Sequence, residues 1–226
     1  MTPLLETHQL CRQADDGTLL IEDLSVAFPA GSRTAIMGAP GSGKTLLLRL
    51  LAFLDPITSG EIRLRGNLVP DHGIPRARRQ VQLISQKPVL IEGTVRENLR
   101  LPYSFRGNRD RMFDEAWHVE HLRSLKRQPD FLDRYIGELS GGESQIVTLL
   151  RGLQMAPVAL LLDEPTSSLD EDTALAIESL IHCWLQEKGE RTLVIVTHTE
   201  HQAIRLAERR VTMDRGRIVD VEEGWR

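Results

Sequence analysis

Cysteines, aromatic residues and long apolar runs are all scarce in this chain of 226 residues. The two cysteines, Cys11 and Cys183, are far apart and follow no metal-ligand spacing, which excludes a disulfide framework and a cysteine zinc site. We expect both to be buried as small apolar side chains in a reducing compartment. The most apolar run, residues 46–54, contains Arg49 and is much shorter than the roughly 20 apolar residues that a membrane-spanning helix needs.

The chain also has no signal-peptide pattern and no dominant charge. It carries 28 Lys and Arg against 32 Asp and Glu, so nothing indicates a face that binds nucleic acid. The basic run at residues 76–79 precedes a predicted strand and is typical of a solvated helix face. We therefore expect a soluble intracellular protein that reaches a membrane only through a partner.

One stretch, residues 38–45, carries a specific signal. It reads G-A-P-G-S-G-K-T and fits the phosphate-binding pattern G-x-x-x-x-G-K-[ST] at every fixed position. Residues 34–37 before it read as a buried strand, and residues 46–54 after it read as a helix whose N-terminus faces the loop. The sequence therefore predicts that a nucleoside triphosphate binds to Gly38, Ala39, Pro40, Gly41, Ser42, Gly43, Lys44 and Thr45.

The residues of this loop also predict how its backbone and side chains hold the ligand. Backbone N–H groups can turn inward around a polyphosphate where glycines leave room. Lys44 adds a positive charge for the terminal phosphates, and the hydroxyl of Thr45 can ligate Mg²⁺.

Polar residues follow the other predicted buried strands. Residues 159–163 form a continuous apolar run that ends in Asp163 and Glu164. The aspartate can hold Mg²⁺ through water, and the glutamate can orient and deprotonate a water that attacks the γ-phosphate. Residues 192–196 are a second such strand, and we expect the following His198 to contact the γ-phosphate.

Two further segments are candidates for the same site. Residues 81–84 predict a strand that presents Gln86, whose amide can reach a Mg²⁺ shell or a water. Residues 139–143 read L-S-G-G-E and open a helix, so exposed N–H groups at its start form a second anion-binding cradle. Because one chain has no obvious use for two cradles, we expect Ser140, Gly141 and Gly142 to close over the nucleotide of another subunit.

The element pattern predicts an α/β protein with a phosphate-loop NTPase core and a mostly parallel sheet. Strands at residues 4–12, 21–28 and 34–37 follow one another through tight turns and predict an antiparallel sheet at the start of the chain. Residues 102–136 have a helical pattern with no strand candidates, so residues 87 to about 155 predict an inserted α-helical subdomain within a single domain of residues 1–226. The remaining parts, residues 1–86 and 156–226, would then form the α/β core.

Taken together, these motifs resemble the nucleotide-binding subunit of ATP-binding-cassette (ABC) transporters over essentially the whole chain. The matching segments, in the family's order, are the phosphate loop at 38–45, the glutamine loop at Gln86, the signature at 139–143, the Walker B strand at 160–164, the D-loop at 167–170 and the histidine switch at His198. The resemblance implies an ATPase whose hydrolysis of ATP to ADP and phosphate is coupled to transport across a membrane.

The resemblance also implies roles and partners. ATP and Mg²⁺ would be the ligands, with Thr45, Gln86 and Asp163 around the metal. Lys44 would hold the phosphates and Glu164 would be the general base. Two copies would pair head to tail around two ATP molecules and bind an integral membrane permease, which places the chain at the cytoplasmic face of the cell membrane.

Two features depart from the family's usual pattern. Residues 10–14, where an aromatic residue usually stacks on adenine, contain none; Ala14 aligns there, with Arg12 or Gln13 beside it. The signature continues as E-S-Q-I from Glu143, where Gln and Arg are commoner at the first and last positions.

Residues 94–102 and 150–157 are similar to enterobacterial ATP-binding proteins proposed to export iron. A different class stays open: an ABC-type ATPase that regulates or scaffolds a membrane complex and transports nothing. The ATPase residues would be the same in both classes. A soluble ABC ATPase of DNA repair or translation would carry a long coiled-coil insertion or a second cassette, and this sequence has neither.

Overall fold

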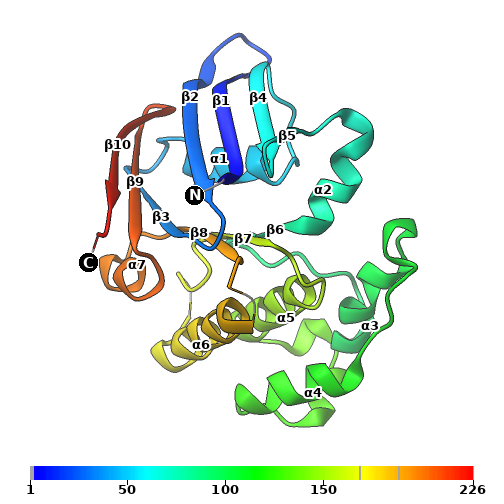
Figure 1. Cartoon of the computed structure of the whole chain (residues 1–226). Coiled ribbons are helices and arrows are strands. Elements are labelled where there is room, and N and C mark those ends of the chain that lie inside the picture. The colour runs from blue at the N-terminus through cyan, green and yellow to red at the C-terminus, as the bar shows by residue number, and fades with distance from the viewer. Residues whose placement is uncertain (1–2, 168, 188, 226) are drawn as a thin grey trace. The chain divides into compact units, whose positions relative to one another are not determined.

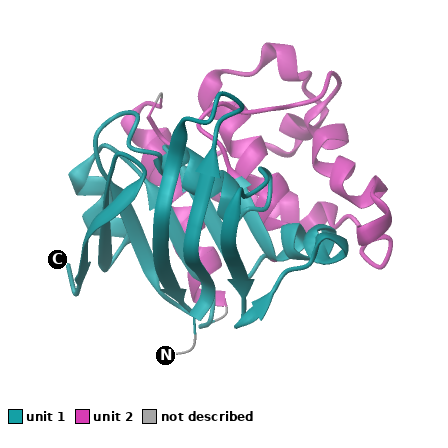
Figure 2. Cartoon of the chain, turned by 90° about the horizontal axis from the view of Figure 1, so that it is seen from above, with its two compact units in different colours: residues 1–83, 157–164, 188–226 teal, residues 84–156, 165–187 magenta. Residues whose placement is uncertain are grey.

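The computed structural model describes residues 3–167, 169–187 and 189–225 (Figure 1). Packing divides the chain into two compact units (Figure 2). Unit 1 comprises residues 1–83, 157–164 and 188–226, and unit 2 comprises residues 84–156 and 165–187.

Unit 1 contains an antiparallel sheet with the strand order β2-β1-β4-β5. Its strands are β1 (Pro3–Gln13), β2 (Leu19–Pro29), β4 (Ser59–Leu64) and β5 (Asn67–Leu68). The turn between β1 and β2 is closed by hydrogen bonds from Ala14 N to Thr18 O and from Gly17 N to Ala14 O, at 2.9 and 3.0 Å. The predicted N-terminal antiparallel β part is therefore confirmed.

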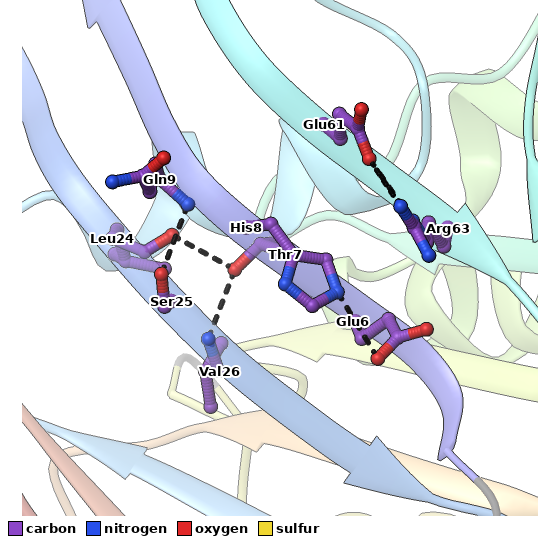
Figure 3. A network of polar contacts seen from close by, with 9 residues as sticks. All are labelled: Glu6, Thr7, His8, Gln9, Leu24, Ser25, Val26, Glu61 and Arg63. Carbon is purple, nitrogen blue, oxygen red and sulfur yellow. Dashed lines mark hydrogen bonds and ion pairs between the residues drawn. The ribbon is translucent and has the colours of Figure 1, made fainter. Parts of the chain in front are cut away.

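A side chain stabilises this sheet where the register between β1 and β2 shifts, between Thr7 and Leu10 (Figure 3). The buried Thr7 Oγ1 donates to Leu24 O at 3.0 Å and accepts from Val26 N at 3.1 Å. Gln9 N donates to Ser25 Oγ at 2.9 Å. Hydroxyl groups thus satisfy backbone groups that the irregularity removes from the ladder, which a buried strand requires.

The second sheet of unit 1 has the order β10-β9-β3-β8-β7-β6. Its strands are β3 (Arg33–Met37), β6 (Val81–Ile84), β7 (Ala159–Asp163), β8 (Thr192–Val196), β9 (Arg209–Asp214) and β10 (Arg217–Glu223). The pairs β3–β8, β3–β9 and β7–β8 are parallel, whereas β9–β10 is antiparallel. The helices α1 (Lys44–Leu51), α2 (Ile74–Gln80) and α7 (Glu200–Leu206) belong to the same unit. The predicted phosphate-loop α/β core with a mostly parallel sheet is confirmed.

The strand at residues 34–37 does not join the antiparallel sheet, so that part of the prediction is wrong. As β3 it pairs in parallel with β8 and β9. Its central residues Thr34, Ala35 and Ile36 are fully buried, as expected for a strand covered on both faces. The helix predicted at residues 46–54 is α1, which ends at Leu51, and Phe53 has a left-handed φ of 57° that no helix continues through.

Unit 2 is helical. It contains α3 (Val95–Arg100), α4 (Glu115–Ser124), α5 (Gly141–Leu153) and α6 (Glu171–Glu187), with single 3₁₀ turns between α3 and α5. Thr94 with Glu97 and Ser140 with Glu143 form reciprocal caps at the starts of α3 and α5. The predicted inserted helical part is confirmed. Packing also places residues 165–187 here, whereas the sequence-based division had put them in the core, because α6 contacts α5.

The expectation that both cysteines are buried is wrong: Cys183 is exposed and Cys11 is only half-buried. The buried stripe of α6 is formed by Ile177, Ile181 and Trp184, which follow one another at helical spacing. Cys183 lies beside this stripe and faces solvent. Within the described residues, no helix is long and apolar enough to cross a membrane.

His118 is a fully buried titratable residue in unit 2. Gln154 Nε2 donates to Leu99 O at 2.8 Å, so its Oε1 is left to accept from His118 Nε2, also at 2.8 Å. The imidazole ring stacks on Phe113 with centroids 4.8 Å apart. Burial disfavours the charged imidazolium and lowers the pKa of His118 from 6.5 to about 4.

This pKa predicts a pH-dependent stability. In the unfolded chain His118 is protonated below about pH 6.5, whereas in the folded chain it is protonated only below about pH 4. Between these values acid stabilises the unfolded chain, so the folded state loses stability as the pH falls through this window. The loss amounts to about 3 kcal/mol over the whole window. The free energy of unfolding in urea should therefore fall more steeply with acid in the wild type than in His118→Gln. The exposed His72→Gln serves as control and should follow the wild type; parallel profiles for wild type and His118→Gln would contradict the assignment.

Candidate functional site

The segment between β3 and α1 is a loop that only glycine can form at its first position. Gly38 has φ 143°, and a Cβ placed there would lie 2.2 Å from Met213 O and 2.9 Å from Ser42 Oγ. Gly41 and Gly43 also have positive φ angles, 78° and 100°. These backbone conformations allow consecutive N–H groups to point to one side, as an anion-binding loop requires.

The turn between β9 and β10 holds this loop in place. Gly216 N donates to Ser42 O at 3.0 Å, and Glu22 N of β2 donates to Gly216 O at 3.1 Å. A Cβ at Gly43 would lie 3.0 Å from Ile21 Cδ1 and 3.5 Å from Leu20 O. The loop is thus supported by backbone from two elements that are distant in the sequence.

Polar groups in the loop are ready for a charged ligand. The Lys44 ammonium group is buried and donates to Gly38 O and Ala39 O, each at 2.8 Å. Burial lowers the pKa of Lys44, while the nearby Glu164 and Asp163 carboxylates act in the opposite direction. Ser42 Oγ is buried without a hydrogen-bond partner among the described residues. A polyphosphate would satisfy this hydroxyl and the first N–H groups of α1, so the loop fits such a ligand.

Thr45 and Asp163 form a pair of oxygen ligands beside the loop. Thr45 Oγ1 donates to Asp163 Oδ1 at 3.2 Å, and Asp163 is the last residue of the buried strand β7. Burial raises the pKa of Asp163, and the hydrogen bond from Thr45 works against this rise. The described residues contain no group of three His, Cys, Asp or Glu side chains that could enclose a metal. One carboxylate and one hydroxyl nevertheless fit Mg²⁺, which takes its remaining ligands from water and phosphate oxygens.

Glu164 and His198 meet at the adjacent strand ends. Because β7 and β8 are parallel with Asp163 opposite Val196, the residues that follow them emerge side by side. Glu164 Oε1 lies 2.8 Å from His198 Nε2. Glu164 N donates to Val196 O at 2.9 Å, and its φ of 47° is unusual for a residue with a side chain. Such strain persists where the surroundings fix a side chain for a task.

The ends of β3, β7 and β8 therefore bring Lys44, Thr45, Asp163, Glu164 and His198 together with the rest of the predicted phosphate loop, residues 38–43. Open parallel sheets bind ligands at this edge.

The other predicted site residues belong to unit 2. Gln86 is exposed after β6, and its Nε2 donates to Ser167 Oγ at 3.3 Å. Ser140 Oγ accepts from Glu143 N at the start of α5. A Cβ at Gly142 would lie 3.2 and 3.3 Å from side-chain atoms of Thr173 and Leu169, so this glycine packs closely on the start of α6. Ser168, within the predicted D-loop at 167–170, lies outside the described residues.

Sequence reasoning missed the residues that support the loop from outside, Met213, Gly216 and Leu20. Their contacts with the loop are made by backbone atoms, which no residue pattern reveals. An exposed apolar pair, Leu19 and Leu20, begins β2 next to Gly43.

Comparison with known proteins identifies the family. The protein family described as "ABC transporter" matches residues 21–167. ABC transporter I family member 17 of Arabidopsis thaliana is 35% identical over 220 residues, which cover 97% of this chain and 82% of that protein. The probable iron export ATP-binding protein FetA of Escherichia coli is 34% identical over 212 residues, 94% of this chain and 92% of that protein.

Solved structures agree with the sequence matches. The ATP-binding cassette MJ0796, solved as a dimer in a post-hydrolysis state bound to ADP and Pi, superposes with a TM-score of 0.83 at 26% identity. The match covers 97% of this chain and 98% of that one. With its phosphate loop and the carboxylates beside it, the chain belongs to the ABC transporter family and is one of its ATP-binding, ATP-hydrolysing cassettes.

Proposed function

We propose that the chain is the ATP-hydrolysing subunit of a membrane transporter and works as a head-to-tail dimer that encloses two ATP molecules. The observation that carries this proposal is the meeting of a phosphate loop, an oxygen-ligand pair and a carboxylate–imidazole pair at the ends of β3, β7 and β8. The relative MJ0796 is itself described as a dimer bound to ADP and Pi, which supports the pairing.

The residues of unit 1 divide the work of hydrolysis. The loop from Gly38 to Thr45, with the Lys44 charge, would bind and orient the phosphates. Mg²⁺ held by Thr45 and Asp163, with Gln86 as a further contact, would neutralise charge on the phosphate oxygens. The Glu164 carboxylate would accept the proton of the attacking water, and His198, which is hydrogen-bonded to that carboxylate, would orient it and contact the γ-phosphate.

The start of α5 would complete the site of the partner copy. Ser140, Gly141 and Gly142 present a hydroxyl and helix N-terminal N–H groups, which are donors suited to a phosphate. The movement of such a dimer as it opens and closes would be transmitted to an integral membrane permease through the segment that follows Gln86. The chain would then lie at the cytoplasmic face of the cell membrane without spanning it.

The substrate that we propose is iron, exported from the cell. This rests on the likeness to FetA over almost the full length of both chains. Comparable identities relate the chain to the tungstate uptake protein TupC of Peptoclostridium acidaminophilum, at 33%, and to the phosphate import protein PstB 2 of Natronomonas pharaonis, at 35%, so the test of the substrate must follow other elements besides iron.

Replacing Gly38 by Ala tests the phosphate loop. The added Cβ would overlap Met213 O, so the loop must shift, and affinity for a fluorescent ATP analogue should fall at least about 50-fold. Gly66→Ala is the matched control, since Gly66 also has a positive φ, 74°, but nothing lies within 4 Å of its Cβ. The control should lose about 1–2 kcal/mol of stability and keep its affinity. Equal affinities for both variants would argue against the loop as the nucleotide site.

Replacing Glu164 by Gln tests the general base and the dimer. The amide cannot accept the proton, so hydrolysis should fall at least about 100-fold while ATP binding persists. Unhydrolysed ATP should then trap the pair, which sizing chromatography detects as an ATP-dependent shift from monomer to dimer. The half-buried Glu61→Gln, whose carboxylate pairs with Arg63 on β4, should hydrolyse ATP at the wild-type rate. Undiminished hydrolysis in Glu164→Gln would remove Glu164 from the mechanism.

Deleting the gene in the source organism tests the substrate. Without the ATPase, exported iron would accumulate, so elemental analysis should show raised cellular iron and growth should become sensitive to ferrous salts. Complementation with the wild type should reverse both effects, whereas Glu164→Gln should not. Unchanged iron with an altered level of another element would contradict iron as the substrate, and no change in any element would favour a regulatory or scaffolding role.

A further inference from the structure

A carboxylate lies within the segment that we propose completes the partner's ATP site. Glu143 is the third residue of α5, and its side chain is only 12% exposed. Its Oε2 accepts from Ser140 N at 2.9 Å, while Glu143 N donates to Ser140 Oγ at 3.2 Å. Glu143 therefore sets the position of the serine at the entrance of α5.

This arrangement has an electrostatic cost. A carboxylate beside a helix N-terminus is favourable for the helix, but it repels a phosphate that approaches the same terminus. A neutral side chain could form the same cap without that repulsion. The negative charge of Glu143 must therefore be offset for the cradle to bind an anion.

Arg134 supplies that offset. Its Nη1 lies 2.8 Å from Glu143 Oε1, and Arg127 Nε is a more distant second cation at 3.9 Å. Burial alone would raise the pKa of Glu143, but the Ser140 N–H and the Arg134 guanidinium hold it below its ordinary value. The carboxylate is thus ionised and paired.

Arg134 is held in place before any nucleotide arrives. Its Nη2 donates to Glu138 O at 2.9 Å, and its guanidinium lies over the Phe131 ring at 5.5 Å from the centroid. Its backbone carbonyl accepts from Val95 N at 3.0 Å, the first residue of α3. A side chain fixed on both sides loses little entropy when it binds a carboxylate.

We propose that Arg134 is a positioning residue of the cradle at residues 140–142: it holds Glu143 so that Ser140 stays capped, and it cancels the carboxylate charge where the partner's phosphate binds. The inference rests on the proposed function, since it assigns a role to residues of the composite site. It predicts that Arg134 is needed because residue 143 is charged, and is dispensable when that residue is neutral.

Hydrogen exchange of the nucleotide-free chain tests the positioning step. Arg134→Gln should remove the guanidinium that holds the Glu143 carboxylate in place, so amides in residues 139–143 should exchange about tenfold faster. Arg96→Gln is the matched control, because Arg96 also forms ion pairs in unit 2, with Asp133 and Glu115, and should leave residues 139–143 unchanged. Unaltered exchange at residues 139–143 in Arg134→Gln would overturn the positioning role.

ATP-dependent dimerisation tests the electrostatic step, with every variant made in the Glu164→Gln chain. Arg134→Gln should weaken dimerisation at least tenfold, while the affinity of the monomer for a fluorescent ATP analogue stays unchanged. Adding Glu143→Gln should restore dimerisation to within about threefold of the reference, because a neutral cap needs no counter-charge. Arg134→Lys keeps the positive charge but not the planar guanidinium that can bind a carboxylate through two N–H groups. Its dimerisation should be intermediate between that of Arg134→Gln and that of the reference.

The outcomes separate this inference from the proposed function. A dimerising reference in which Arg134→Gln is harmless, or is equally harmful with and without Glu143→Gln, would overturn the role of Arg134 alone. A Glu164→Gln reference that binds ATP and stays monomeric would overturn the composite site, and the inference with it.

Discussion

The phosphate loop depends on one constraint: its backbone must be held from outside. A loop that turns its N–H groups toward a ligand has few of them left for hydrogen bonds along its own length, such as that from Ser42 N to Ala39 O at 3.1 Å. Further support comes from the β9–β10 turn, where Gly216 N donates to Ser42 O, and from the Met213 carbonyl that packs against Gly38. The C-terminal hairpin is therefore part of the nucleotide site although none of its side chains needs to touch the ligand. Gly38 and Gly216 are both required at these contacts. A Cβ at Gly38 would overlap Met213 O, and a Cβ at Gly216 would overlap Leu20 O.

The charged side chains beside this loop are buried in a way that a bound ligand would compensate. Burial disfavours the charged forms of both Lys44 and Asp163, and each is only partly compensated by its neighbours. A polyphosphate with a divalent cation would place negative charge next to Lys44 and positive charge next to Asp163. Binding would thus relieve two unfavourable burials at once, which would favour a metal-bound triphosphate over the free nucleotide.

Sequence reasoning succeeded where the signal is local and failed where it depends on distant partners. The loop at residues 38–45 and the strand ending in Asp163 are both encoded by consecutive residues, and their elements are found where expected. The strand at residues 34–37 was assigned to the wrong sheet, because a short turn suggests a neighbour but burial on both faces decides the pairing. Met213 and Gly216 were missed because they act through backbone atoms, which leave no residue pattern. Arg134 gave no signal either, since its partner Glu143 is recognised only once the start of α5 is folded.

The phosphate loop and the proposed cradle at the start of α5 differ in the chemistry that they can perform. The loop in unit 1 has a buried lysine, a carboxylate paired with a hydroxyl, and a second carboxylate paired with an imidazole, so it can both bind and activate. The start of α5 offers a serine hydroxyl and backbone N–H groups. The Glu143 carboxylate beside them is bound to Arg134 and Ser140, so it is not available as a general base. Such a cradle can hold a phosphate but not hydrolyse it. A site of this kind is useful only when it closes on ATP that another loop has bound, and it must then be neutral to close well. The pairing of Arg134 with Glu143 meets that requirement, so the local electrostatics of unit 2 agree with the proposed head-to-tail dimer.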